Sequence, residues 1–428
     1  MNSWLKKYIY LHLPAFKSRN FRLFFSGQIL SLSGTFMTQV TISWLIYNLT
    51  NSAWLLGLNG FLQFLPTLIL TPFSGVLCDR WSRRNLLMLV QILGIIVSFT
   101  LTTLTFLGFV DFRLLMIVAI LGGFLKGLDM PVRSAIVIET LDDRADLSNA
   151  IALYSAILSS SMLIGPAIGG MLLATVGAKY CFLYDSLSYV IALLTLAAMR
   201  LAPTPKSNLS YNDTWQKLQQ GFSYVYSIFP IRVILLVLAL NGLTGMSYVA
   251  LLPIFAADIL KGDGGTMGLL TAASSVGSLL ACVYLSLRRQ VLGLERLIAL
   301  SLVIIGIGLI AFGLSRELWL SVLILVVIGG GGILQLTGGN TIIQTLVEDD
   351  KRGRVMSLYT LAVIGTQPLG NLLAGSIAQY IGAANTIIAC GIICFAESVW
   401  FGGQLPLLTS CIRLKINSTK NLSKLTAS

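Results

Sequence analysis

Charge is what this sequence lacks most. Charged residues make up 11% of the 428 residues, whereas hydrophobic residues make up 56% and the mean hydropathy is +0.84. Soluble globular domains carry about 25% charged residues, so this composition excludes that class. Apolar runs long enough to cross roughly 30 Å of hydrocarbon recur along the chain, without the alternation of a membrane barrel strand. The sequence therefore predicts a membrane protein whose spans are helices.

Residues that bind metals or nucleotides are scarce as well. His12 is the only histidine, the six cysteines are scattered, and no phosphate-binding loop is present. We therefore expect no metal, no cofactor and no nucleotide site of the kind that an ATP-driven pump needs. A membrane-embedded enzyme would need a nucleophile and a base that converge, and the sequence carries no such motif.

The apolar runs predict about twelve spans, separated by charged breaks. A polar stretch rich in proline and serine divides them into two groups of six and is typical of a cytoplasmic linker. The expected organisation is an amino-terminal arm at 1–22, a six-helix bundle at 23–200, the linker at 201–231, a second bundle at 232–407 and a basic tail at 408–428. The expected spans are 24–47, 53–76, 86–109, 112–138, 149–176, 178–199, 232–257, 265–287, 295–314, 317–346, 355–381 and 384–406.

Basic residues gather in the arm, the linker, the tail and alternate loops. The loops of the opposite set hold only Arg113, Lys179, Lys261 and Arg316. Because cytoplasmic loops carry the excess of lysine and arginine, both termini are expected in the cytoplasm. The same asymmetry accounts for the net charge of +12, so nucleic acid is not an expected partner.

The two halves are related in sequence. A shift of 205 residues aligns the run that starts at Leu153 with the run that starts at Leu358 and matches three pairs of glycines without a gap. Together with the six-plus-six layout, this repeat predicts two pseudo-symmetric bundles with a substrate site between them, as in a rocking transporter. The matched glycines are Gly165 with Gly370, Gly170 with Gly375, and Gly177 with Gly382.

The stretch GVLCDRWSRR, residues 75–84, resembles the signature loop of the major facilitator superfamily between its second and third helices. The segments DMPVRSAIVIE (129–139), DLSNAIAL (146–153) and IGPAIGG (164–170) resemble the branch of enterobactin exporters and macrolide-efflux proteins. The resemblance implies a twelve-helix major facilitator fold and a proton-driven exporter of small molecules in the bacterial inner membrane, expected as a monomer.

In this family the signature loop is a cytoplasmic latch, which the resemblance assigns to Gly75, Asp79, Arg80, Arg83 and Arg84. A carboxylate at the end of the second span can accept hydrogen bonds from arginine or from helix N-termini and so hold the closed state. A plain positive-inside anchor is the alternative, but it would need only the arginines. The matching loop of the second half has Ala281 where an acid would stand.

Three charged residues lie well inside the fourth span. Lys126, Asp129 and Arg133 share one helix face, and each charge costs roughly 2.5–3.5 kcal/mol at the helix centre, so they are expected to face the bundle interior and neutralise one another. They are candidates for substrate or proton coupling, with a structural salt bridge as the alternative. Asp185 and Glu397, in the sixth and twelfth spans, compete for the proton, and packing roles are equally open for both.

The fifth span carries the segment that resembles the exporter motif: Gly165, Pro166, Gly169 and Gly170. Glycines allow close helix crossing and proline bends the axis, so the motif suits a seal or pivot, although general packing also explains glycines. The chain has Ser159 and Met162 where the branch tends to carry Asn and Arg, which favours a neutral or less anionic cargo. Seven amide residues are candidate polar groups of the cavity, although any one of them can equally serve a hydrogen bond between helices. They are Gln28, Gln39 and Gln63 in the first half and Gln335, Asn340, Gln344 and Gln367 in the second.

The sequence as a whole predicts a secondary transporter that exports a small organic molecule, a siderophore or an amphiphilic drug, by proton antiport with alternating access. A proton-coupled importer and a non-transporting membrane sensor stay open as alternatives. The expected partners are the small-molecule substrate, protons and the lipid bilayer.

Overall fold

The computed structural model describes residues 13–201, 223–288, 290–348 and 351–426. The side chains of residues 71–80 and 416–426 lie outside this description too. Most of the expected linker and His12 therefore fall outside the described residues, as do the surroundings of Gly75 and the side chains of Asp79 and Arg80.

The first half of the chain forms six long helices after a short 3-10 turn, η1 (Pro14–Lys17). They break where polar residues supply caps: Ser82 accepts a hydrogen bond from the Asn85 N–H, and Asp111 accepts one from the Phe112 N–H. The six helices are α2 (Arg19–Thr50), α3 (Ala53–Arg80), α4 (Arg83–Phe106), α5 (Phe112–Glu139), α6 (Leu147–Thr175) and α7 (Ala178–Ala198), with the 3-10 turn η2 (Arg144–Asp146) before α6.

The second half forms six more spans, two of which are interrupted. The expected span 232–257 is split into α9 and α10 and runs on into a π-helical turn, and the expected span 355–381 contains a π-helical turn at its middle. The elements are α9 (Phe229–Leu243), α10 (Tyr248–Ile254), η4 (Phe255–Ile259), α11 (Gly264–Leu287), α12 (Leu294–Leu314), α13 (Leu318–Leu346), α14 (Arg352–Thr360), η5 (Leu361–Gly365), α15 (Gln367–Ile381) and α16 (Ala383–Thr426).

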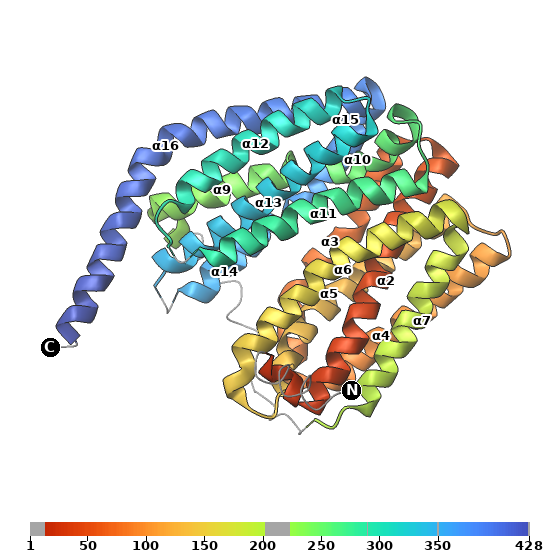
Figure 1. Cartoon of the computed structure of the whole chain (residues 1–428), viewed down its shortest axis with the longest axis horizontal. Coiled ribbons are helices and arrows are strands. Elements are labelled where there is room, and N and C mark those ends of the chain that lie inside the picture. The colour runs from red at the N-terminus through yellow and green to blue at the C-terminus, as the bar shows by residue number, and fades with distance from the viewer. Residues whose placement is uncertain (1–12, 202–222, 289, 349–350, 427–428) are drawn as a thin grey trace. The chain divides into compact units, whose positions relative to one another are not determined.

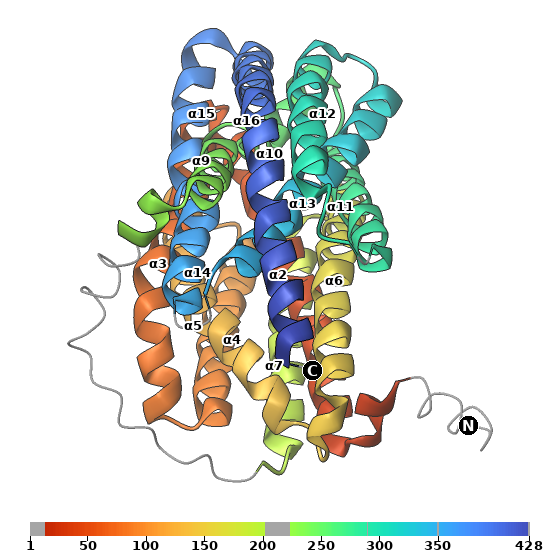
Figure 2. The same ribbon diagram turned by 90° about the vertical axis from the view of Figure 1, so that its left-hand side faces the viewer.

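Within the described ranges, twelve helical segments are long and apolar enough to cross a membrane. This confirms the predicted all-helical fold with twelve spans. The last helix differs in length from the expected span 384–406, because α16 continues to Thr426 (Figures 1 and 2). The sequence after Pro406 contains neither glycine nor proline to end it.

The described residues divide into two compact units. Unit 1 comprises residues 13–51, 62–201 and 261–272, and unit 2 comprises 52–61, 223–260 and the described residues from 273 onward. In unit 1, α2 packs against both α6 and α7 (Figure 1). The first part of α3 therefore belongs to unit 2 and the rest of α3 to unit 1, whereas the first part of α11 belongs to unit 1 and the rest of α11 to unit 2.

The internal repeat has a structural counterpart at the helix junctions. Gly177 joins α6 to α7 with a φ of 90°, and Gly382 joins α15 to α16 with a φ of 83°. This region of backbone space favours glycine, so the two matched positions make the same turn for the same reason.

The second pair of matched glycines allows close helix contact. Gly170 of α6 packs on Gly268 within unit 1, and Gly375 of α15 packs on Gly57 within unit 2. A side chain at any of these four positions would meet the backbone of its partner. Equivalent glycines thus perform the same packing in both repeats.

In unit 2, α12 and α16 lie side by side over much of their length (Figures 1 and 2). The contact is close because it is made at glycines: Gly306 faces the backbone of Phe395, and Gly391 faces the carbonyl of Gly306 and the backbone of Ile310. Helices in a membrane gain no hydrophobic free energy by associating, so such close packing is a main source of their attraction.

We predict that Gly306→Leu lowers the thermal unfolding temperature of the purified protein, because the added side chain forces α12 and α16 apart. The free energy of unfolding is expected to fall by about 2 kcal/mol, as it does when other protein interiors are overpacked. Gly402→Leu is the matched control, because Gly402 also lies on α16 but no atom lies within 4 Å of the position that its Cβ would take. Equal unfolding temperatures for the two variants would contradict this packing.

Candidate functional site

Unit 1 contains a cavity of about 140 Å³. One water needs about 10–15 Å³ of such space, so the cavity has room for several waters or for part of a small ligand. Its walls come from all six helices α2 to α7 and are mainly apolar. Its polar lining residues are Thr35, Thr38, Gln39, Gln63, Ser98, Lys126, Asp129, Arg133, Tyr154, Asp185 and Tyr189.

The fourth span places two of its three charges in direct contact. Asp129 Oδ2 and Arg133 Nε form an ion pair one helical turn apart, and both residues are buried. Arg133 Nη2 also lies 3.4 Å from Ser31 Oγ on α2. The pair is incompletely satisfied, since Asp129 Oδ1 and Arg133 Nη1 have no hydrogen-bond partner in the described part of the chain. A proton on Asp129 would leave Arg133 as a buried unpaired cation.

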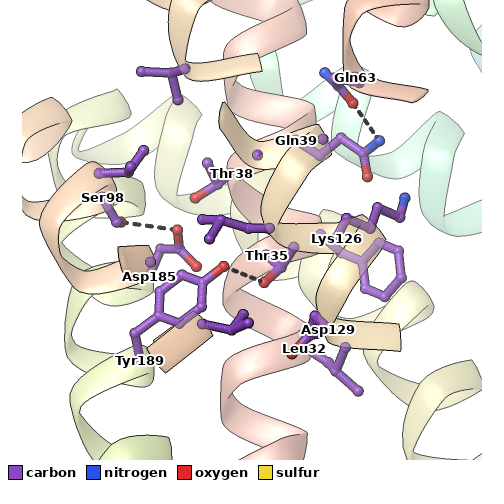
Figure 3. Close-up of a pocket in the computed structure, with 18 of the residues that line it drawn as sticks. Leu32, Thr35, Thr38, Gln39, Gln63, Ser98, Lys126, Asp129, Asp185 and Tyr189 are labelled. Carbon is purple, nitrogen blue, oxygen red and sulfur yellow. Dashed lines mark hydrogen bonds between the residues drawn. The ribbon is translucent and has the colours of Figure 1, made fainter. Parts of the chain in front are cut away.

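Lys126 departs from the expected mutual neutralisation. Its Nζ lies 4.5 Å from the centre of the Phe64 ring of α3, and among the described residues no carboxylate lies within ion-pair distance of it. On the same side of the cavity, Gln39 Nε2 donates to Gln63 Oε1 at 2.7 Å (Figure 3). The position of the lysine inside the bundle was predictable from the sequence, but its contact with Phe64 was not, because that contact depends on how α3 packs on α5.

Asp185 lies on the other side of the cavity, beyond Thr35 (Figure 3). Its side chain is buried, and Oδ2 accepts a hydrogen bond of 2.9 Å from Ser98 Oγ of α4. Tyr189, one turn further along α7, shares a hydrogen bond of 3.3 Å with Thr35. Gly34 of α2 lets the carboxyl come this close, because a side chain there would meet Asp185 itself.

Ser98 was not predicted as a site residue from the sequence. It belongs to a buried hydroxyl cluster in which Ser186 Oγ donates to Ser98 Oγ at 3.2 Å and Thr102 and Ser186 share a bond of 3.0 Å. The sequence feature that could have indicated this cluster is the pair Ser98 and Thr102, two hydroxyl residues one turn apart within a largely apolar span. The structure therefore gives Asp185 polar partners but, among the described residues, no cation.

Glu397 does not belong to this cavity. It is a buried residue of α16 in unit 2, and neither carboxyl oxygen has a hydrogen-bond partner among the described residues. One turn before it, Cys394 contacts Thr244, with Sγ and Oγ1 3.3 Å apart.

The arginines of the signature loop bind the ends of two neighbouring helices. Arg83 Nη1 donates to Glu139 Oε1 at 2.9 Å and to the Ala135 carbonyl at 3.2 Å, both at the end of α5. Glu139 was not among the expected site residues. The ion pair ties the loop between α3 and α4 to the cytoplasmic end that the sequence assigns to the fourth span.

Arg84 makes the corresponding contact at the end of α7. Its Nε donates to the Leu196 carbonyl at 3.0 Å and Nη2 donates to the Ala197 carbonyl at 2.8 Å. A cation is favourable at a helix C-terminus, where the last carbonyls lack partners within the helix. Both arginines thus fix helix ends within unit 1.

The glycines of the fifth span let α6 approach its neighbours. Side chains at Gly165 and Gly169 would meet Ser33 and Met37 of α2, respectively. Pro166 is buried inside α6 without ending the helix. Two of the motif's glycines therefore set the distance between α6 and α2, the helix that also carries Thr35 and Gln39.

Twelve helices of the described residues are long and apolar enough to span a membrane, and a mainly apolar cavity carries polar and charged groups on its wall; both features are typical of a multi-pass transporter. The profile of the family described as transmembrane secretion effector matches residues 12–411. The chain belongs to this family of major facilitator transporters. Its membership confirms the predicted superfamily and the prediction of a transporter rather than an enzyme.

Curated relatives resemble the chain over most of its length. It is 26% identical to the staphyloferrin A transporter of Staphylococcus aureus over 89% of this chain and 95% of that one. It is 24% identical to macrolide efflux protein A of Streptococcus pyogenes over 89% and 96%, and 23% identical to the multidrug efflux pump Tap of Mycolicibacterium fortuitum over 83% and 88%.

Solved structures share the fold at low identity. A peptide transporter POT superposes with a TM-score of 0.73 and 12% identity, covering 92% of this chain and 96% of its own. The nucleoside transporter NupG superposes with a TM-score of 0.69 and 14% identity over 89% of this chain. At such identity the likeness establishes the fold alone.

We predict that breaking the α5 ion pair is more destabilising than removing it. Asp129→Leu leaves Arg133 buried without its partner, whereas Asp129→Leu combined with Arg133→Met leaves no charge behind. Removal of one partner of a buried pair typically costs about 3–5 kcal/mol, so the double variant is expected to unfold at the higher temperature.

Thermal unfolding of the purified single and double variants measures this difference, with Arg133→Met alone completing the cycle. A double variant as unstable as the sum of the two single variants would show that the pair is not coupled in the folded protein.

Proposed function

We propose that this chain exports a small organic molecule, a siderophore or an amphiphilic drug, across the bacterial inner membrane by proton antiport with alternating access. The observation that carries the proposal is the cavity of unit 1, where two buried acids, Asp129 and Asp185, line a space with room for several waters or for part of a small ligand. The direction rests on the relatives, two of which are named as efflux proteins.

The two acids occupy different surroundings and suit different steps. Asp129 is held by Arg133, so its protonation would leave an uncompensated positive charge on α5 beside Ser31 of α2 and favour another packing of these helices. Asp185 Oδ2 accepts a hydrogen bond from Ser98, and no cation pairs with this carboxyl among the described residues, so a proton there converts an acceptor into a donor without disturbing an ion pair. A carboxyl that gains or loses a proton as the cavity opens to each side in turn couples transport to the gradient.

The other site residues take supporting roles in this proposal. Gly165, Pro166, Gly169 and Gly170 form the pivot at which α6 moves against its neighbours, as the close packing of three of them on other helices supports. Arg83 and Arg84 fix helix ends near the cytoplasmic latch, to which Asp79 would contribute the carboxylate.

The proposed orientation places both termini in the cytoplasm. It follows from the lysines and arginines of the arm, the signature loop and the tail. Two six-helix bundles, 23–200 and 232–407, joined by the linker 201–231, remain the proposed domain organisation, and the protein is proposed to act as a monomer.

Transport into inside-out vesicles tests the proposal. Energised vesicles are expected to accumulate radiolabelled erythromycin or staphyloferrin A, and an uncoupler should abolish the accumulation. Asp129→Asn and Asp185→Asn are each expected to reduce uncoupler-sensitive uptake at least tenfold, because an amide cannot carry the proton. Asp111→Asn, an exposed cap of α5 outside the cavity, is expected to transport like the wild type.

Accumulation that resists the uncoupler would contradict proton antiport. Uptake confined to right-side-out vesicles would contradict export. Full activity in both cavity variants would move the coupling site out of unit 1 and make Glu397 the residue to replace next.

A further inference from the structure

We propose that Lys126 forms, together with the neighbouring Phe64 ring and the Gln39–Gln63 amide pair, a subsite that binds the anionic group of the cargo. The cargo is accordingly an organic anion with an apolar body, such as an aromatic or aliphatic carboxylate. This inference rests on the proposed function and narrows its substrate class.

The position of Lys126 excludes a role as a membrane-surface anchor. It lies near the midpoint of α5, about 20 Å along the helix axis from either end, which is more than a lysine side chain can span. A charge at such depth is costly, and lysines in spans are almost always turned towards a partner or a wet cavity. Lys126 lines the cavity.

The acids of the cavity do not neutralise this lysine. Asp129 is paired with Arg133, and Asp185 lies across Thr35 with Ser98 as its hydrogen-bond donor (Figure 3). The contact with Phe64 at 4.5 Å compensates part of the cost of burial, but a ring face does not neutralise charge. The side of the cavity that holds Lys126 therefore carries positive potential, which an anion entering it would balance.

The surroundings of Lys126 suit a carboxylate attached to an apolar group. Ammonium and amide N–H groups both donate to carboxylate oxygens, and the Gln39–Gln63 pair lies on the same side of the cavity. The Phe64 ring and apolar lining residues such as Ile42 and Val118 offer contact to the rest of the molecule. An amphiphilic anion matches both features.

This assignment departs from one expectation of the sequence. Met162, where related proteins tend to carry arginine, favoured a neutral or less anionic cargo. Lys126 supplies a cation from α5 in place of one from α6, and it does so on the wall of the cavity, to which Met162 does not contribute.

Binding of a matched pair of probes to the purified full-length protein tests the proposal. The probes are 2-naphthoate and 2-naphthamide, which share a ring system and differ in charge, and titration calorimetry in detergent measures their affinities. The wild type is expected to bind naphthoate at least tenfold more tightly, the ratio that one charge-assisted hydrogen bond supplies. Lys126→Met should abolish this preference and leave the affinity for naphthamide unchanged, whereas Lys126→Arg should retain it.

Lys179→Met is the matched control. Lys179 also lies over aromatic rings, those of Phe106 and Tyr180, but it does not line the cavity, so its loss should leave the preference intact. Equal binding of the two probes to the wild type, no binding of either, or a preference that survives in Lys126→Met would each overturn the proposal. The comparison of the two probes on the wild type tests the proposal even if a variant fails to fold.

The assay uses no gradient and no vesicle, so it separates this inference from the proposed function. A charge preference that depends on Lys126, in a protein that fails to transport in vesicles, would support the subsite and refute export. Uncoupler-sensitive export by a protein that binds both probes equally would do the reverse.

Discussion

The cost of placing charge in hydrocarbon is the constraint on which this structure depends. Each charge at the centre of a membrane helix costs roughly 2.5–3.5 kcal/mol, and α5 carries three within two turns. The bundle offsets this cost by closing a cavity around them, in which Asp129 and Arg133 pair with one another and Lys126 rests against an aromatic ring. Lys126 and Asp185 remain without an ion-pair partner among the described residues, so the net charge of the cavity depends on which ligand or proton enters it. A transporter can use that dependence.

Glycine is what lets the polar groups meet. The carboxyl of Asp185 comes up against α2 because Gly34 carries no side chain, and α6 reaches the same helix through Gly165 and Gly169. In unit 2 the same device brings α12 to α16 at Gly306. Close packing and polar contact are therefore linked in unit 1, since only helices that approach closely place short side chains within hydrogen-bond distance.

The sequence predicted the fold well because composition and span length determine it almost alone. It also placed the α5 charges in the interior, since their spacing puts them on one helix face. Their partners were harder to predict: Phe64 and Ser98 lie on other helices, and contacts between helices depend on rotations that a single sequence does not determine. The breaks between α9 and α10 and within the eleventh span were not predicted either. Hydropathy depends on composition and does not report a local change of helical pitch.

Transport through unit 1 requires that water and solutes reach its cavity, and a cysteine placed in the cavity wall measures this access. Gly122 lines the cavity, and no atom lies within 4 Å of the position its Cβ would take. In a variant lacking the six native cysteines, we expect Gly122→Cys to react with a membrane-impermeant anionic thiosulfonate in inside-out vesicles. Leu115→Cys, a core position on the same helix, should stay unmodified. Equal protection of both cysteines would show that the cavity is closed to solutes and would contradict transport through unit 1.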